Sequence, residues 1–194
     1  MSVIDPSTRV VTLAGIDIET TGLLEPEHRI IEIYIGLWRA GQRVFEFEQR
    51  IDPQRSIGVE AQRVHGISTA DLIGKPTWDI VGPKVHKVLS VADAYVWHNG
   101  DEFDGPFIDM ELKRIGLLLP KKPAVDTMLE GVWATPDGKK PRLEELCFAC
   151  GVPYDKDEAH AAPYDVNVMM QSYYRGVDWS FFRAPPVGSL QTAA

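Results

Sequence analysis

Apolar residues cluster along the chain in short runs that predict β-strands. Each run is rich in β-branched, aromatic or leucine residues and is bounded by glycine, proline or polar turn residues. The runs are Val10–Ile16, Ile30–Arg39, Val44–Ile51, Ala94–Trp97 and Ala124–Thr127. The second and third runs are separated by a short segment with the turn residues 40–42, so we expect the first three strands to form an antiparallel meander.

Between and after these strands, apolar residues recur every three or four positions, a spacing typical of helices. Helical segments are expected within Val59–Leu72, over Thr77–Leu89, from Asp104 to Ile115, over Arg142–Cys150 and from Val166 to Tyr173. Pro83 leaves the start of the second segment open, because a proline inside a helix costs about 3 kcal/mol. A meander followed by alternating strands and helices predicts an α/β fold, with a mixed five-stranded sheet and helices on both faces.

Length and composition predict one main domain. A chain of 194 residues, 44% of them hydrophobic, can bury one substantial core and is too short for two. We place this domain at residues 1–176 and expect a partly ordered tail at residues 177–194. The aromatic residues of the tail, Trp179, Phe181 and Phe182, could cover the domain's own core or a groove of a partner, and Gly188–Ala194 is expected to fray.

Charge and the start of the chain narrow the classes of function. The net charge of −8 argues against a basic surface that grips duplex nucleic acid through many phosphates, so any nucleic-acid contact is expected to be local. Residues Met1–Arg9 lack the pattern of a secretion signal, and no apolar run approaches the ~20 residues that span a bilayer. We therefore expect a cytoplasmic protein without membrane contact.

Two acidic residues, Asp17 and Glu19, directly follow the first apolar run. Their spacing puts both side chains on one face of an extended strand. Carboxylates at the exit of a buried strand need a counter-charge, which a divalent metal ion supplies most economically. The pair therefore predicts half of a metal site.

Two further acids stand where helices are expected to begin. Asp104 is expected at the N-cap of its helix, with Pro106 in the first turn. Asp165 lies at the entry to the last helix, five residues after His160. Because strand ends and helix starts can meet at one edge of a sheet, four carboxylates and one imidazole can gather there. Such a set suggests metal-assisted hydrolysis.

A zinc or redox module built on Cys147 and Cys150 is a competing interpretation. The two thiols share one helix face with Leu143 and Leu146, so we expect them to be small core residues. A structural zinc ion would also need further ligands of its tetrahedral kind.

The motifs follow one another in an informative order. The main ones are Asp17–Gly22, then His98 and Asn99 with Phe103 and Asp104, and finally His160–Asp165; lesser landmarks between them are His65–Ser68, Asp126 with Thr127, and Leu143–Leu146. This order resembles the DEDDh 3′-5′ exonucleases, the DnaQ-like family that includes the proofreading epsilon subunit of DNA polymerase III. The resemblance extends from about Val10 to Arg175.

The second motif departs from the family pattern by one residue. The family usually places its Phe-Asp pair one position closer to His-Asn, and the segment 100–102 holds the extra residue. Asp101 therefore competes with Asp104 for the catalytic position. We favour Asp104, because the apolar pattern that follows it is the one the family's helix shows.

The resemblance implies a ribonuclease H-like fold and two Mg²⁺ or Mn²⁺ ions that assist hydrolysis of the terminal phosphodiester at a 3′ end. In that family scheme Asp17 bridges both ions, and Glu19 and Asp165 complete the site of the ion that carries the nucleophile. Asp104 holds the second ion. His160 takes the proton from the attacking water, a task that suits an imidazole with a pKa of ~6.5.

The resemblance also implies a set of residues around the terminal nucleotide. Thr20, Thr21 and Leu23 are expected to border it, with Leu23 against the base. His65 could contact the nucleotide or simply pack in its loop. Phe103 could stack on a base, although a core position is favoured.

Two other places offer substrate contacts. His98 and Asn99 are expected to order the end of a strand more than to perform chemistry. Lys139 and Lys140 belong to a loop that is the best candidate for a local basic contact with the phosphates of an approaching strand. An ordinary solvated loop is the alternative.

Three functions remain open from the sequence. The first is 3′-5′ exonuclease action on single-stranded or frayed DNA, releasing nucleoside 5′-monophosphates, with a polymerase or another replication protein as a possible partner. The second keeps the chemistry but acts on RNA, which the 2′-OH distinguishes. The third is a non-catalytic nucleic-acid-binding accessory module, against which the retention of costly clustered acids argues.

Overall fold

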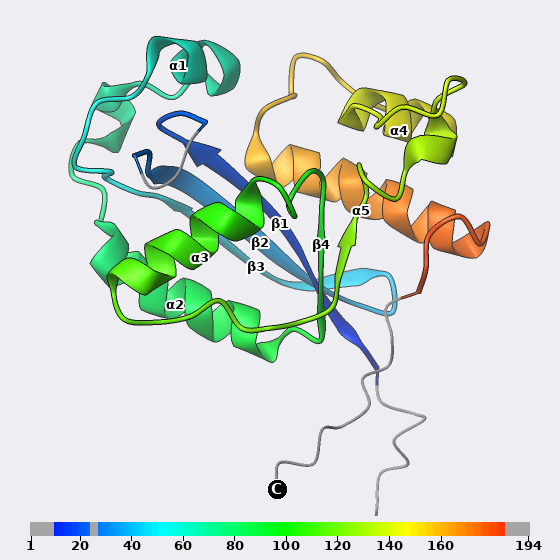
Figure 1. Cartoon of the computed structure of the whole chain (residues 1–194), viewed down its shortest axis with the longest axis horizontal. Helices are drawn as coiled ribbons and strands as arrows, with labels where there is room; N and C mark the ends of the chain where they lie inside the picture. Colours follow the sequence, from blue (N-terminus) through cyan, green and yellow to red (C-terminus); the bar gives the residue numbers. More distant parts are fainter. Residues whose placement is uncertain (1–9, 24–26, 185–194) are drawn as a thin grey trace, which may run out of the picture.

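A computed structural model of the chain describes residues 10–23 and 27–184, and Figure 1 shows its arrangement. The strands are β1 (Thr12–Thr20), β2 (Ile30–Arg39), β3 (Gln42–Arg50), β4 (Ala94–Trp97) and β5 (Ala124–Asp126). The helices are α1 (Val59–His65), α2 (Trp78–Val91), α3 (Asp104–Arg114), α4 (Leu143–Cys150) and α5 (Ala162–Asp178), with short 3₁₀ turns η2 (Thr69–Leu72) and η3 (Val132–Ala134).

The five strands form one mixed sheet in the order β3-β2-β1-β4-β5. The first three pair in antiparallel fashion, and β4 and β5 join β1 in parallel. Helices α2 and α3 cover one face of the sheet, and α4 and α5 cover the other (Figure 1). The predicted α/β class, the meander and the helices on both faces are confirmed.

Strand β1 is longer than its apolar run predicts. Its antiparallel pairing with β2 continues to the contact of Thr20 with Ile30, so Asp17 and Glu19 lie inside the strand and not after its end. The ladder of hydrogen bonds therefore fixes the backbone of both acids.

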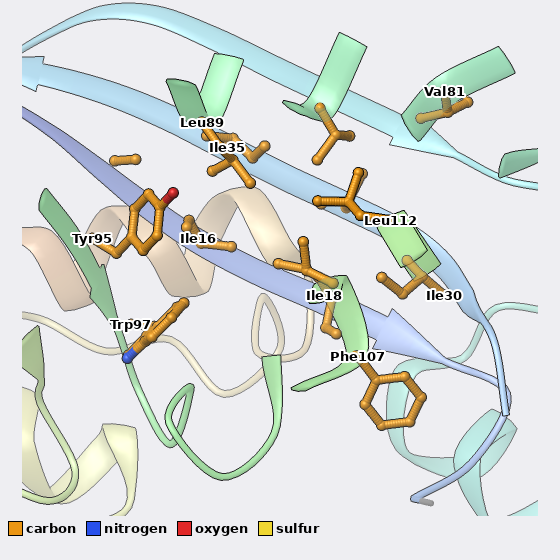
Figure 2. Packing of buried hydrophobic residues seen from close by; sticks show 14 of the residues in the cluster. Ile16, Ile18, Ile30, Ile35, Val81, Leu89, Tyr95, Trp97, Phe107 and Leu112 are labelled. Carbon is orange, nitrogen blue, oxygen red and sulfur yellow. The ribbon is translucent and has the colours of Figure 1, made fainter. Parts of the chain in front are cut away.

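Alternate residues of β1 face different halves of the core. Ile16 and Ile18 pack with residues of α2 and α3, such as Leu89 and Phe107, in the apolar cluster that Figure 2 shows. The residues between them point to the opposite face, the one that α5 covers. Because Asp17 and Glu19 belong to this second set, their carboxylates lie on the α5 side of the sheet.

Gly15 allows α5 to approach this face closely. A Cβ atom on Gly15 would lie 2.8 Å from Cγ1 of Val166 and 3.0 Å from Cγ of Met170. Real side chains do not tolerate such contacts, so any larger residue would push α5 away. The close approach brings the first turn of α5 toward Asp17, two residues along β1.

Pro83 does not end the second predicted helix. Helix α2 begins at Trp78 and continues to Val91, with Pro83 inside it. Val85 and Leu89 are fully buried on its inner face. Their burial offsets the hydrogen bond that proline cannot donate.

Packed structure continues past the boundary expected at residue 176. Helix α5 ends at Asp178, and Phe182 is buried in the same core cluster as α4 and α5. Phe181 stacks on Trp133 with ring centroids 4.6 Å apart. The aromatic residues up to 182 thus cover this domain's own core, whereas Gly188–Ala194 lies outside the described residues.

The two thiols are core residues, as expected. Cys147 and Cys150 are free and buried, and the Ser172 hydroxyl contacts the sulfur of Cys147 at 3.5 Å. Burial raises the pKa of Cys147 to about 11, which keeps it protonated and unreactive. In the described part of the chain, no helix has the length and apolar character needed to cross a membrane.

Candidate active site

Four predicted acids gather where β1, α3 and α5 meet. Asp17 and Glu19 extend from β1, Asp104 is the first residue of α3, and Asp165 lies in the first turn of α5. Burial raises the pKa of Asp17 well above its ordinary value, and the negative charges of the other three acids raise it further. The fold therefore brings residues from three distant segments within electrostatic reach of one another.

The same environment acts on the other acids. Burial, with the charge of Glu32, raises the pKa of Glu19 to about 8. Burial raises the pKa of Asp104 to about 7 and also raises that of Asp165. Within the described residues, none of these four acids forms an ion pair with lysine or arginine. The cluster carries a negative charge that the protein itself leaves without a partner.

The structure corrects the expected N-cap of α3. Phe103 occupies the cap position, and Asp104 is already helical. Backbone N–H groups of Asp104 itself and of Ile18 in β1 act on its carboxylate and partly offset the burial that raises its pKa. The Asp104 side chain therefore lies near the strand that carries Asp17 and Glu19.

The side chain of Asp101 bonds to Trp97 and does not join the acid cluster. Its carboxylate accepts a hydrogen bond of 2.8 Å from the indole of Trp97, and its side chain is exposed. Gly100 makes this possible, since a Cβ there would lie 2.0 Å from the Trp97 ring. The segment with the extra residue of the second motif thus packs beside Trp97. Asp104 is the acid whose charge raises the pKa of Asp17.

His160 lies at the rim of the acid cluster. Its imidazole is exposed, and its backbone N–H donates to Oδ2 of Asp165 at 3.1 Å. The backbone of His160 adopts a left-handed conformation with φ of 64°, which non-glycine residues rarely adopt. The hydrogen bond from the His160 N–H to Asp165 joins the loop to α5 and keeps the imidazole close to the acids.

Two buried atoms test whether the cluster fits metal ions. Oδ1 of Asp104 and Oδ1 of Asp165 are buried and have no hydrogen-bond partner in the described structure. Unpaired buried carboxylate oxygens are costly, and hard divalent cations prefer such ligands. In residues 10–23 and 27–184, no group of three or more acidic, histidine or cysteine side chains is arranged so that it could hold a metal ion as it stands. The donors therefore fit Mg²⁺ or Mn²⁺ in type and charge, and binding would have to draw them together.

Asp126 organises the loop that leads to Asp104. Its buried carboxylate accepts backbone N–H groups of Asn99, Asp101 and Met128 at 2.9–3.0 Å. His98 is held by the Thr127 hydroxyl at 2.9 Å from Nδ1, and burial lowers its pKa to about 4. His98 and Asn99 thus order the end of β4, in the place the sequence predicts for them.

A pocket of about 520 Å³ opens beside Glu19. Its wall includes the predicted nucleotide contacts Thr20, Thr21, Leu23, His65 and Phe103, together with Gly22, His28 and residues 58–61 and 64. Leu23 is largely exposed at the edge. The volume and the apolar wall suit one nucleoside.

His65 and Phe103 line the pocket and also pack against their own neighbours. His65 lines the pocket while its Nδ1 accepts the backbone N–H of Ile67 at 3.0 Å, and burial lowers its pKa. Phe103 lines the pocket and also packs on Phe107, with ring centroids 4.9 Å apart.

Lys139 and Lys140 do not extend freely from their loop. Lys139 pairs with Glu145 at 3.2 Å, and Lys140 pairs with Glu102 at 3.0 Å. A phosphate would have to compete with these carboxylates. The loop therefore carries less available positive charge than its sequence indicates.

Sequence reasoning missed Glu32. It faces Glu19 across the β1–β2 ladder, is buried, and pairs with Arg50 at 2.7 Å. Its position in an apolar strand is the same signal that identified Asp17, and it could have been found in that way. Glu32 adds negative potential to the cluster while its own charge is balanced by Arg50.

Comparisons with known proteins agree with this arrangement. A family model described as "Exonuclease" matches residues 14–173. The DNA polymerase III subunit epsilon of Rickettsia felis is 32% identical over 167 residues, which cover 81% of this chain and 70% of that protein. A PolC-type DNA polymerase III of Halalkalibacterium halodurans is 30% identical over 161 residues, covering 83% of this chain but only 11% of that much longer polymerase.

Solved structures share the fold. A zinc-bound complex of E. coli exonuclease I with single-stranded DNA superposes with a TM-score of 0.77 over 88% of this chain and 41% of that chain. The sequence identity is 16%, so the likeness concerns the fold, and it confirms the predicted ribonuclease H-like architecture. The chain therefore belongs to the exonuclease family, in the DnaQ-like group that its motifs predict.

Proposed function

We propose that the chain is a metal-dependent 3′-5′ exonuclease that acts on single-stranded or frayed DNA and releases nucleoside 5′-monophosphates. The observation that carries this proposal is the cluster of four unpaired acids with raised pKa values beside a pocket of nucleoside size. An exonuclease I relative in fold binds single-stranded DNA, which supports the choice of substrate.

Asp17, Glu19, Asp104 and Asp165 would hold two Mg²⁺ or Mn²⁺ ions. The chemistry that such ions supply is acidification of the attacking water and stabilisation of the leaving 3′ oxygen. The rigid pairing of β1 with β2 fixes Asp17 and Glu19, while α3 and α5 each present one further carboxylate.

His160 is the proposed general base. An exposed imidazole beside the acids can take the proton of the attacking water and pass it to solvent. The hydrogen bond from its backbone to Asp165 keeps this residue attached to the cluster.

The pocket supports removal of one nucleotide at a time. A base that packs among Leu23, Phe103 and the α1 side of the pocket would leave its sugar and phosphate beside Glu19. A pocket of about 520 Å³ suits one nucleotide, and the next nucleotide of the strand would lie outside it. The geometry therefore favours removal of single terminal nucleotides.

A replication polymerase is the proposed partner. The matched epsilon subunits and PolC-type enzymes are parts of DNA polymerase III by name, and this chain spans about a tenth of the length of the PolC-type relatives. A proofreading partner would deliver frayed 3′ ends to the pocket.

The proposal is tested by digestion of 5′-labelled oligonucleotides, with and without a 3′-phosphate block. With Mn²⁺, the wild-type protein is expected to shorten unblocked DNA from the 3′ end one nucleotide at a time, and a 3′-phosphate block is expected to slow it. Asp17→Asn is expected to lower the rate at least a thousandfold, and EDTA is expected to abolish it.

A matched RNA oligonucleotide decides the substrate class. Faster digestion of RNA than of DNA would replace DNA with RNA as the substrate. Binding of either oligonucleotide without nucleotide release would identify a non-catalytic module. Equal rates for the wild type and Asp17→Asn would overturn the proposed chemistry.

A further inference from the structure

One residue of the nucleotide pocket is not explained by its motifs. His28 lines the pocket, and its imidazole is half-buried against the turn that follows β1. A Cβ on Gly22 would lie 2.2–2.5 Å from three atoms of the His28 ring. Gly22 has no left-handed backbone, so this position is a glycine because the ring packs on it and not because of a tight bend.

A chain of hydrogen bonds holds Nδ1 of His28. The backbone N–H of Arg29 donates to the Thr21 hydroxyl at 3.0 Å. The same hydroxyl lies 3.0 Å from Nδ1 of His28. The hydroxyl oxygen accepts from Arg29, and its own hydrogen can be donated to Nδ1, an arrangement that leaves the ring proton on Nε2.

Nε2 remains available to the pocket. Among the described residues it has no hydrogen-bond partner, and it is not one of the fully buried polar atoms. The ring itself cannot turn freely, because Gly22 packs against it and Thr21 holds Nδ1. In the tautomer with the proton on Nε2, His28 presents one N–H donor at the wall of the pocket.

We infer that His28 binds the 3′-terminal base by donating a hydrogen bond from Nε2. The ring packs on Gly22, next to Leu23, on the apolar wall that suits a base. Adenine N3 and thymine O2 both offer an acceptor on one base edge, so a single donor there can serve different bases. This inference rests on the proposed function and adds a contact that does not depend on sequence.

Two substitutions distinguish the proposed contact of Nε2 with the base from the contact of Nδ1 with Thr21, which supports the turn. His28→Asn keeps a polar atom near Nδ1 for Thr21 but removes the donor at Nε2. His28→Gln places an amide N–H near the position of Nε2 and loses the contact with Thr21. His86→Asn, on α2, is the matched control because it makes the same change far from the pocket.

KM and kcat are measured on two DNA strands, one ending in thymidine and one ending in an abasic residue. On the thymidine strand, His28→Asn is expected to raise KM about threefold to tenfold with little change in kcat, while His28→Gln stays near the wild type. On the abasic strand, His28→Asn is expected to match the wild type. An unchanged KM on the thymidine strand, or the same increase on both strands, would overturn the contact.

Product binding keeps this test independent of catalysis. Affinities for thymidine 5′-monophosphate and 2-deoxyribose 5-phosphate are measured by calorimetry with Mn²⁺ present. His28→Asn is expected to weaken binding of the first ligand only. A wild-type protein that digests no DNA would refute the proposed function, whereas equal affinities of wild type and His28→Asn for the nucleotide would refute the role of His28.

Discussion

Buried Glu111 and the cluster of buried acids differ in how their negative charge is balanced. Glu111 of α3 is almost fully buried, and it bonds to Arg29 through both Nε and Nη2, with the second contact at 3.0 Å. Arg114 lies 3.8 Å from the same carboxylate. Asp17 is surrounded by other acids, and the charge of Asp104 raises its proton affinity. One group is a completed ion pair, and the other needs a cation from outside.

The difference separates a buried charge that stabilises the fold from the charges that we propose bind metal ions. The Glu111 pair ties α3 to the start of β2, and Arg29 also carries the carbonyl that receives Thr21 N–H at 2.9 Å. It therefore supports the frame around the candidate site. The acid cluster lowers the stability of the metal-free fold, and that cost is expected where a site is built to bind cations.

The largest expected contrast is between Glu111→Gln and Asp17→Asn. Glu111→Gln leaves the charge of Arg29 partly buried without a partner and is expected to lower the free energy of unfolding by about 2–4 kcal/mol. Asp17→Asn removes repulsion and is expected to leave the metal-free melting temperature unchanged or raise it. Chemical denaturation of both variants in EDTA measures the contrast. Destabilisation by Asp17→Asn as large as that by Glu111→Gln would contradict it.

Bound metal ions are expected to balance the charge of the acid cluster, as Arg29 balances the charge of Glu111. At a hundred times its Kd, Mn²⁺ bound only to the folded state is expected to stabilise the protein by about 2.7 kcal/mol. The measurement is a melting curve in EDTA and then in increasing Mn²⁺ or Mg²⁺. Asp17→Asn serves as the control and is expected to lose most of this shift. A wild-type melting temperature that ignores saturating metal would refute the metal site.

The pH dependence of the metal-free protein follows from the raised pKa values. The pKa of Glu19 rises from 4.5 to about 8 on folding. Between these pH values the unfolded chain has released a proton that the folded chain still holds, so stability is expected to fall as pH rises from about 5 to 8. Glu19→Gln is expected to flatten this slope, and saturating Mn²⁺ is expected to suppress it. Urea denaturation at several pH values in EDTA measures both effects.

Local patterns predict the sheet and its motifs well. The runs Ile30–Arg39 and Ala94–Trp97 coincide with β2 and β4, because strongly apolar segments between turns have few alternatives to a buried strand. The length of β1 escapes prediction. Pairing with β2 carries the strand through Asp17 and Glu19, and a partner strand is not visible in local sequence.

Side-chain contacts formed only in the folded chain cannot be predicted from local sequence patterns. The choice between Asp101 and Asp104 depends on how Trp97 fills the loop, and the partner of Nδ1 of His28 lies seven residues earlier in a turn. Side-chain ion pairs belong to the same class. Lys139 and Lys140 are basic in sequence, but each meets a carboxylate in the fold.

The smallest expected effect concerns these surface pairs, which unlike the pair of Glu111 are exposed to solvent and contribute little to stability. If Lys139 and Lys140 exchange their carboxylates for DNA phosphates, their double replacement by glutamate is expected to weaken binding of single-stranded DNA and to flatten its dependence on salt. Glutamate at both Lys84 and Lys87, two exposed positions on α2, is the matched control for net charge. Fluorescence anisotropy at several salt concentrations measures the difference. Equal weakening by both double variants would show that the loop contributes only its charge, because a local phosphate contact has to depend on position.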